Sequence, residues 1–217
     1  GRQWHAGKNA RSHAPAGATL EVPQFWGQRQ VLQRFTWASP ALSGLVYVSQ
    51  QPLQIGLAAE VDLILADDLP VSTLAIVPGR PLRIGDYYDA ISLVSQVSPS
   101  RLRAAGLSYP TWVVPRYLQL PPTVTQRTRD LALRIVNEAG AITPYDQALA
   151  LEVWLRREIR YAESASPLPP DRADFVDWVL FEAREGYCSH YASAMVVMLR
   201  SLGVPARVAA GFALALK

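Results

Sequence analysis

The sequence predicts an α+β protein, with a β-rich, sandwich-like N-terminal domain followed by a mainly helical part. Short apolar segments rich in β-branched residues, separated by turn residues, recur from about residue 28 to residue 97. After a proline-rich stretch at residues 98–122, the apolar residues recur at helical spacing instead. We therefore expect a β-rich domain over residues 20–120 and a second domain over residues 121–217. Residues 1–19 are small and polar, and we expect them to be disordered.

The expected strands of the first domain are short. They cover residues 29–37, 45–48, 61–65, 73–77 and 87–94. Turn signals such as Pro78-Gly79 and Gly85-Asp86 separate them. Residues 98–122 contain repeated prolines, which lack the backbone donor that a long element needs. This stretch is therefore expected to be an irregular connector.

Two helices are expected at the start of the second domain. The first covers residues 124–138, and the second begins at Thr143-Pro144-Tyr145-Asp146 and runs to Glu158. Thr143 suits the N-cap, Pro144 suits the first helical position, and Asp146 places an anion in the first turn. The apolar residues expected to face the core are Val124, Leu131, Ile135 and Val136 on the first helix, and Leu149, Val153, Trp154 and Ile159 on the second.

Two further helices and a strand complete the expected second domain. A short helix covers residues 174–181, and the nearby Asp171, Asp174 and Asp177 are expected to start it and to solvate its exposed side. A longer helix from Cys188 to Leu202 is apolar almost all round, which is typical of a helix buried within a domain. Gly203 suits its C-cap. Residues 207–214 are expected to form a strand.

Composition excludes several classes of function. Of the 217 residues, 50% are hydrophobic, which is enough for a sizeable core. The net charge of +3 and the pI of about 9.2 come from scattered residues, so we expect no nucleic-acid partner. A single cysteine excludes an internal disulfide, and with three histidines it offers no metal-ligand spacing. We expect no metal and no cofactor, and no apolar run is long enough to span a bilayer.

Cys188 stands out because it lies at the expected start of the buried helix, directly after Gly186-Tyr187. The positive end of a helix favours the anionic form of a thiol, and the thiolate is the reactive form. Gly186 leaves room for another group to approach the backbone. From residue chemistry alone, two interpretations of Cys188 remain open: a catalytic nucleophile, or a small hydrophobic residue of the core.

None of the histidines is an obvious base for Cys188. His190 lies two residues away, and positions i and i+2 of a helix point to different sides. We expect His190 to pack, or to bond a nearby backbone group. His5 and His13 lie in the segment expected to be disordered. The aromatic residues Trp154, Trp178 and Tyr161 are expected in the core, with the option that one of them lines a cleft.

The residues around Cys188 resemble a known family. Gly186-Tyr187-Cys188, Ala192-Ser193-Ala194-Met195, the run from Leu199 to Arg207 and Gly211-Phe212 resemble the transglutaminase-like core. The likeness is strongest to the bacterial membrane-anchored transglutaminase-like proteins. It covers residues 117–212 well and residues 28–116 more loosely. Residues 213–217 depart from the course that the family usually takes.

The resemblance implies a papain-like fold, of which this chain would carry the helical half, cut off after its first strand. It implies acyl transfer through a thioester on Cys188, without a cofactor, onto an amine or water. The family's histidine and aspartate would follow beyond Lys217, so no residue here is assigned to them. The resemblance also implies a protein or peptide substrate, which could belong to the cell envelope. It places the β-rich domain on the extracytoplasmic face of the bacterial membrane, in a parent protein held there by helices outside this segment.

Two hypotheses follow. In the first, the chain is part of a cysteine-dependent acyl transferase, similar to a protein-glutamine gamma-glutamyltransferase or to a thiol protease. Because members of a catalytic triad act as a unit, the segment by itself would be inactive or nearly so. In the second, the chain is a non-catalytic binding or scaffolding module of the cell envelope, and its transglutaminase core is a relic.

Overall fold

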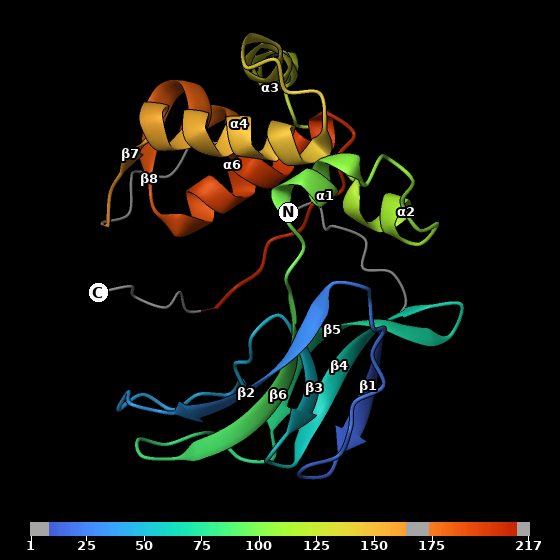
Figure 1. The fold of residues 1–217 in the computed structure, drawn as a ribbon. Helices are drawn as coiled ribbons and strands as arrows, with labels where there is room; N and C mark the ends of the chain where they lie inside the picture. Colours follow the sequence, from blue (N-terminus) through green and yellow to red (C-terminus); the bar gives the residue numbers. More distant parts are fainter. Residues whose placement is uncertain (1–8, 164–173, 212–217) are drawn as a thin grey trace. The chain divides into compact units, whose positions relative to one another are not determined.

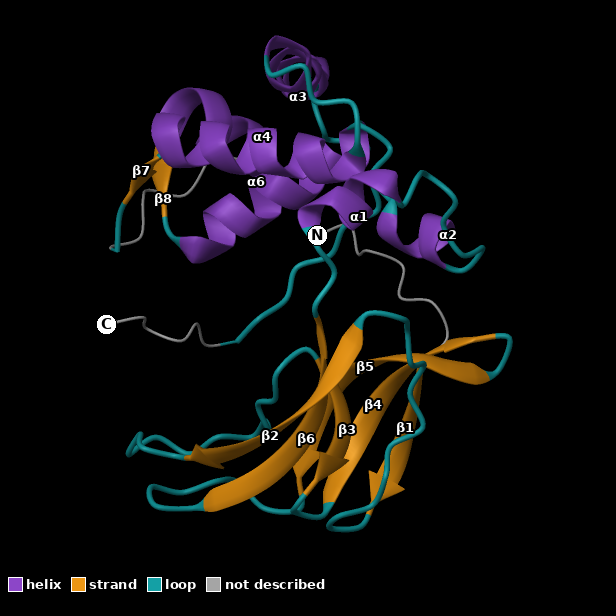
Figure 2. Cartoon of the chain, in the orientation of Figure 1, coloured by secondary structure: helices purple, strands orange, loops and turns teal. Residues whose placement is uncertain are grey.

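The computed structural model of the chain describes residues 9–163 and 174–211 (Figure 1). The described chain forms two compact units, one up to Ser98 and the other from Pro99 onward. Figure 2 shows that the longer strands belong to the first unit and the helices to the second. The expected α+β class, with the β-rich part first, is confirmed.

The first unit consists of two antiparallel sheets. Their strands, in spatial order, are β1 (Asn9–Ala14), β4 (Ala59–Ala66) and β5 (Leu69–Pro78) in one sheet, and β2 (Gln28–Thr36), β6 (Tyr87–Ser95) and β3 (Gln51–Ile55) in the other. Buried side chains from both sheets, including Val61, Ile76, Ile55 and Tyr88, form a single core. The sandwich-like arrangement is therefore confirmed.

Strand β1 differs from the disorder expected for residues 1–19. It pairs along its whole length with β4, from Asn9 opposite Ile64 to Ala14 opposite Ala59. Across this pair the Arg11 guanidinium donates to both carboxylate oxygens of Asp62, at 2.6 and 2.9 Å. The partners of β1 are about fifty residues away in the sequence, so its polar local composition did not indicate a strand. Residues 1–8 lie outside the described part of the chain.

The structure replaces one expected strand with another. Residues 45–48, expected to be a strand, form none, although the N–H of Val46 donates to the carbonyl of Ile76 at 2.9 Å. Strand β3 lies just after them and includes Pro52. Proline is tolerated here because β3 is at the edge of its sheet, where one side of the strand needs no backbone donor.

Residues 98–122 are also more regular than the irregular connector that was expected. They contain two short helices, α1 (Pro99–Ala104) and α2 (Val113–Tyr117). Pro99 opens α1 and Pro115 lies in the first turn of α2, where a missing N–H removes no helical hydrogen bond. The Arg103 side chain pairs with Asp146 at 2.8 Å, which joins α1 to the helix that begins at Pro144, within the same unit. The division between the units therefore lies at Pro99 in the structure.

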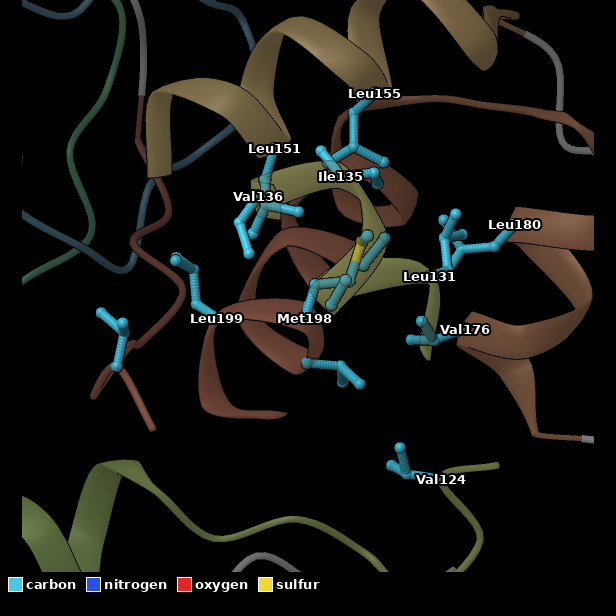
Figure 3. Packing of buried hydrophobic residues seen from close by; sticks show 14 of the residues in the cluster. Val124, Leu131, Ile135, Val136, Leu151, Leu155, Val176, Leu180, Met198 and Leu199 are labelled. Atoms are coloured by element: carbon cyan, nitrogen blue, oxygen red, sulfur yellow. The ribbon is translucent and has the colours of Figure 1, made fainter. Parts of the chain in front are cut away.

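The core of the second unit lies between three helices: α3 (Gln126–Glu138), α4 (Pro144–Glu158) and α6 (Cys188–Ser201). Figure 3 shows their apolar side chains meeting around Met198. The four residues expected to face inward near and on α3 are all buried. On α4 the prediction was wrong for Leu149 and Val153, which are 43% and 55% exposed. Leu151 and Leu155 are buried instead, because α4 carries apolar residues on more than one side and its spacing does not select a single face.

The helix ends agree with the sequence. The Thr143 hydroxyl accepts a hydrogen bond from the N–H of Asp146 at 3.2 Å, and Pro144 is the first residue of α4. At the end of α6, Gly203 has a φ of +79°, and the N–H of Val204 donates to the carbonyl of Leu199 at 2.9 Å. This is a Schellman-type cap, in which glycine supplies the left-handed residue.

The acidic residues of the short helix have different roles. Helix α5 (Phe175–Trp178) continues into a π-helical turn, η1 (Val179–Ala183). Asp174 caps α5, as expected, by accepting from the N–H groups of Val176 and Asp177. The prediction that Asp177 solvates an exposed side was wrong, because Asp177 is buried. Asp171 lies outside the described residues.

Asp177 binds α5 to α3. Its carboxylate accepts from the Arg127 guanidinium at 2.7 and 2.8 Å and from the Thr125 hydroxyl at 2.8 Å. The same guanidinium lies 4.4 Å from the ring centroid of Phe181. Burial by itself would raise the pKa of Asp177, but the hydrogen bonds from Arg127 and Thr125 outweigh it and lower that pKa. The carboxylate is therefore charged at neutral pH.

The chain after α6 is not a strand in the part that the structure describes. Residues 207–211, the described portion of the expected strand at 207–214, form no ladder. A strand needs a neighbouring strand to satisfy its backbone groups, and no strand in the described part of the chain forms a sheet with this segment.

Arg200 holds this segment in place from the last turn of α6. Its guanidinium donates to the carbonyl of Ala206 at 2.6 and 2.8 Å and to the carbonyl of Gln119 at 2.8 Å. The N–H of Ala206 donates in turn to the carbonyl of Tyr117 at 3.1 Å. Burial lowers the pKa of Arg200 from its ordinary value, and the side chain is only 9% exposed. The buried guanidinium donates the hydrogen bonds that water would otherwise donate to these backbone carbonyls.

We predict that Arg200→Lys lowers the free energy of unfolding by about 1–3 kcal/mol, because an ammonium cannot reproduce the planar fork that binds two carbonyls. Urea denaturation measures this change. The matched control is Arg156→Lys: the Arg156 side chain is 75% exposed and pairs with Glu152 one turn away, so the change should stay within about 0.5 kcal/mol. Equal effects of the two substitutions would contradict the role assigned to Arg200.

We also predict that Asp177→Asn destabilises the protein by about 1–3 kcal/mol at neutral pH, because Arg127 loses the buried one of its two carboxylate partners and keeps Glu182, at 2.9 Å. The pKa of Asp177 is lower in the folded state than in the unfolded state. The carboxylate therefore contributes its full stabilisation above about pH 4, the ordinary pKa of an aspartate, and loses it as the pH falls through the folded-state pKa. The difference in unfolding free energy between wild type and variant should therefore shrink in acid. A difference that is constant with pH would contradict this, and the exposed Asp130→Asn serves as control.

Candidate active site

Cys188 is the first residue of α6, and its side chain is exposed. The chain reaches it from a short strand, β8 (Glu185–Gly186), through Tyr187, whose extended backbone (φ −110°) makes it the N-cap. Among the described residues, the backbone N–H of Cys188 has no hydrogen-bond partner. The position at a helix start that the sequence predicted is thus the one observed, and the interpretation of Cys188 as a buried core residue is wrong.

A second short strand lies beside the approach to Cys188. Strand β7 (Arg160–Tyr161) pairs in parallel with β8, with Tyr161 opposite Gly186. The N–H of Ala162 donates to the carbonyl of Gly186 at 3.0 Å. This pairing places Tyr161, which follows the end of α4, next to the turn that carries the thiol.

The thiol opens into a groove of about 970 Å³ between α4, α6 and β7. Tyr161, Tyr191, Ala192 and Met195 provide its apolar wall next to Cys188. The rings of Tyr161 and Tyr191 lie 6.1 Å apart. The Tyr191 hydroxyl donates to the carbonyl of Ile159, and burial raises the pKa of this phenol, so it remains a neutral donor. This wall of the groove is therefore amphipathic.

Ion pairs occupy the charged side of the same groove. The Arg184 guanidinium donates to the Glu158 carboxylate at 2.8 Å and to the Glu158 carbonyl at 3.2 Å. Hydrogen bonds from Arg157 and Arg184 lower the pKa of Glu158, so this carboxylate is ionised and bound to cations rather than available as a base. Arg184 has a left-handed backbone (φ +52°), unusual for a residue other than glycine, at the end of the π-helical turn η1.

His190 does not face the thiol as a free base. Its Nδ1 accepts a hydrogen bond from the backbone N–H of Tyr187 at 3.4 Å, and the residue is only 5% exposed. Its ring lies 4.3 Å from the ring of Tyr187 and 5.0 Å from that of Phe175, between centroids. Burial lowers the pKa of the imidazole. The expectation that His190 packs and bonds a backbone group is confirmed.

Gly186 is required by the same contact. A Cβ atom built on Gly186 would lie 2.6 Å from both Cβ and Cγ of His190, closer than real Cβ contacts allow. The room that the sequence attributed to Gly186 is therefore taken by the His190 ring. Gly186 and His190 are complementary, and together they define the turn into α6.

The remaining predicted residues have other positions. His13 lies on β1, where Nδ1 is 2.8 Å from the Glu60 carboxylate, and His5 lies outside the described residues. Trp154 packs against the helical core and Trp178 is half-buried on α5. Of the three aromatic residues that the sequence singled out, Tyr161 is the one that lines the groove, and it is 60% exposed.

The sequence analysis missed Glu158 and Arg184, whose pairing limits the chemistry of the groove. They are 26 positions apart in the sequence, and no local pattern connects them.

The comparisons with known proteins agree with this geometry. Residues 129–217 match the family model described as the transglutaminase-like superfamily. The chain is 39% identical over 117 residues to a protein-glutamine gamma-glutamyltransferase of Pseudomonas aeruginosa, covering 52% of this chain and 16% of that protein. It is 38% identical over 98 residues to the uncharacterized protein YebA of Bacillus subtilis, covering 45% of this chain and 13% of that protein. The chain thus spans less than a fifth of the length of these relatives.

A solved structure is also similar: the periplasmic domain of TgpA from Pseudomonas aeruginosa, with a TM-score of 0.43 and 23% identity over 82% of this chain and 65% of that one. Residues 129–217 belong to the transglutaminase-like superfamily. The second unit is mainly helical, has Cys188 at the start of its long helix, and contains the described part of the residues that match this family model. None of the helices that the structure describes combines the length and the apolar character needed to cross a bilayer.

We predict that Gly186→Ala destabilises the protein by about 1–3 kcal/mol, because the new methyl group collides with the His190 side chain. Chemical denaturation measures the loss. Gly44→Ala is the control, since its Cβ would meet nothing within 4 Å. The double variant Gly186→Ala/His190→Gly removes the Cβ of residue 190 as well as the ring and should recover part of the loss, and a double-mutant cycle with no coupling between the two positions would contradict the contact.

Proposed function

We propose that this chain provides the nucleophilic half of a cysteine-dependent acyl transferase, similar to a protein-glutamine gamma-glutamyltransferase or to a thiol protease, with Cys188 as nucleophile. One observation carries the proposal: the single cysteine is exposed at the start of the central helix and lines a groove, within a domain of the transglutaminase-like superfamily. A core cysteine would be enclosed by aliphatic side chains instead.

The proposed chemistry is acyl transfer in two steps. The Cys188 sulfur attacks the carbonyl carbon of an amide, and the carbon–nitrogen bond breaks as the nitrogen leaves with a proton, as ammonia or an amine. The resulting thioester is then attacked by an amine or by water, which releases the acyl group and regenerates the thiol. The N–H of Cys188 has no partner among the described residues and is suited to donate to the oxyanion of each tetrahedral intermediate.

The segment by itself should have little activity. In the described part of the chain, the imidazole nearest in sequence, His190, is engaged with the Tyr187 backbone, and Glu158 is engaged with arginines. We therefore propose that a base and its orienting carboxylate are supplied by further residues of a longer protein. Without them, the proton of the thiol and that of the leaving group have no carrier.

The substrate and the location follow from the relatives. We propose a protein or peptide substrate, because a relative is named a protein-glutamine gamma-glutamyltransferase, an enzyme whose acyl donor is a glutamine of a protein. We propose an extracytoplasmic location, because a similar solved structure is a periplasmic domain. The β-rich domain would then belong to the same compartment, with any membrane attachment in the parent protein outside this segment.

The test is the alkylation rate of Cys188 by iodoacetamide. Cys188 is the only thiol, so the same chain unfolded in urea is an internal control. We expect the folded chain to react about tenfold faster than the unfolded one near neutral pH, because the proposed nucleophile is exposed at a helix start, beside backbone amides that attract an anion. In a longer form of the protein that carries a histidine and an aspartate after Lys217, Cys188→Ser should abolish amine incorporation into a protein substrate.

Alkylation that is no faster in the folded chain than in urea would count against an activated nucleophile. Amine incorporation that survives Cys188→Ser in the longer form would count against it independently. Both results together would favour the alternative, a non-catalytic binding module of the cell envelope.

A further inference from the structure

We propose that His190 is a positioning residue for Cys188: through the hydrogen bond from the Tyr187 N–H to its Nδ1, it fixes the turn that presents the thiol and the first amides of α6. The inference rests on the proposed function of Cys188 as the nucleophile. It assigns the histidine beside the cysteine a role other than proton transfer.

The first argument is the position of His190 in its helix. It is the third helical residue after the N-cap Tyr187, and its side chain reaches back to the backbone N–H of that N-cap. Glutamate or glutamine usually makes this bond in the capping box of a helix. In this chain the imidazole takes the same place, with Nδ1 as acceptor at 3.4 Å.

The second argument is that the ring cannot easily leave this position. Gly186 offers it a surface without a Cβ, while the rings of Tyr187 and Phe175 flank it at 4.3 and 5.0 Å between centroids. Burial lowers the pKa of His190, so the imidazole is neutral at neutral pH and Nδ1 retains its acceptor lone pair. These contacts therefore hold the imidazole ring in the orientation in which Nδ1 can accept the hydrogen bond from the Tyr187 N–H.

The third argument is the consequence for the site. Three of the residues involved, Gly186, Tyr187 and Cys188, are consecutive, so any rotation of the Tyr187 peptide moves the thiol. With the Tyr187 amide bound to His190, the next amide, that of Cys188, has no partner among the described residues. A rigid turn keeps this donor and the sulfur in one arrangement, which is what acyl transfer needs from preorganised groups.

The experiment compares His190→Gln with His190→Leu. Glutamine retains an acceptor that can reach the N-cap amide, whereas leucine fills space without one. The readout is the alkylation rate of Cys188 in the folded state relative to urea, with unfolding free energies measured alongside. We expect His190→Gln to keep most of the folded-state enhancement and His190→Leu to lose about tenfold, even where the two variants have similar stability.

Two results overturn the inference alone: a His190→Leu variant that reacts as fast as wild type, or equal losses in both variants, which would assign the effect to packing. If wild type itself shows no enhancement over urea, the proposed function fails, and this inference with it. A variant that does not fold leaves a second measurement on wild type. The ¹⁵N shifts of the His190 ring should show an unprotonated Nδ1 and a protonated Nε2, and the opposite tautomer would overturn the inference.

Discussion

The close contact between Gly186 and His190 is the constraint on which the candidate site depends. There is no space for a side chain at position 186 because the imidazole lies where its Cβ would be. The same imidazole accepts a hydrogen bond from the Tyr187 N–H. Its ring therefore contacts the end of β8 and the N-cap of α6. Pairing of Tyr161 with Gly186 then brings the aromatic wall of the groove to the same point.

Buried charges organise the rest of the helical unit. Asp177 and Arg127 join α5 to α3, and Arg200 joins the end of α6 to the segments around Gln119 and Ala206. In each case a charged side chain is bound to several fixed partners, which offsets the cost of removing it from water. Arg200 thereby holds the C-terminal end of the helix that carries Cys188. The position of the thiol is thus determined at the cap by His190 and at the far end by Arg200.

Local patterns predicted the parts of this structure that local forces determine. Thr143 and Asp174 as caps, Gly203 after α6 and the inward residues of α3 follow from short-range rules, and the structure has them as expected. The inward face of α4, the pairing of β1 with β4 and the burial of Asp177 depend on partners far away in sequence, and these expectations differed from the structure. For the candidate site, the sequence indicated Cys188 and the packing of His190. It gave no signal of the Glu158–Arg184 pair, because its members lie on separate elements.

Under the proposed function, the groove around Cys188 contains some of the groups that acyl transfer needs, but not all of them. Acyl transfer needs a nucleophile, an oxyanion donor and a group that moves protons. Under the proposed function, the sulfur and the amide of Cys188 supply the first two from one turn. The titratable groups nearby are held in other interactions: Glu158 with two arginines and His190 with a backbone amide. An acid–base group placed here would have to compete with these partners, so a base supplied by another segment across the open groove is the arrangement that leaves the turn around Cys188 intact.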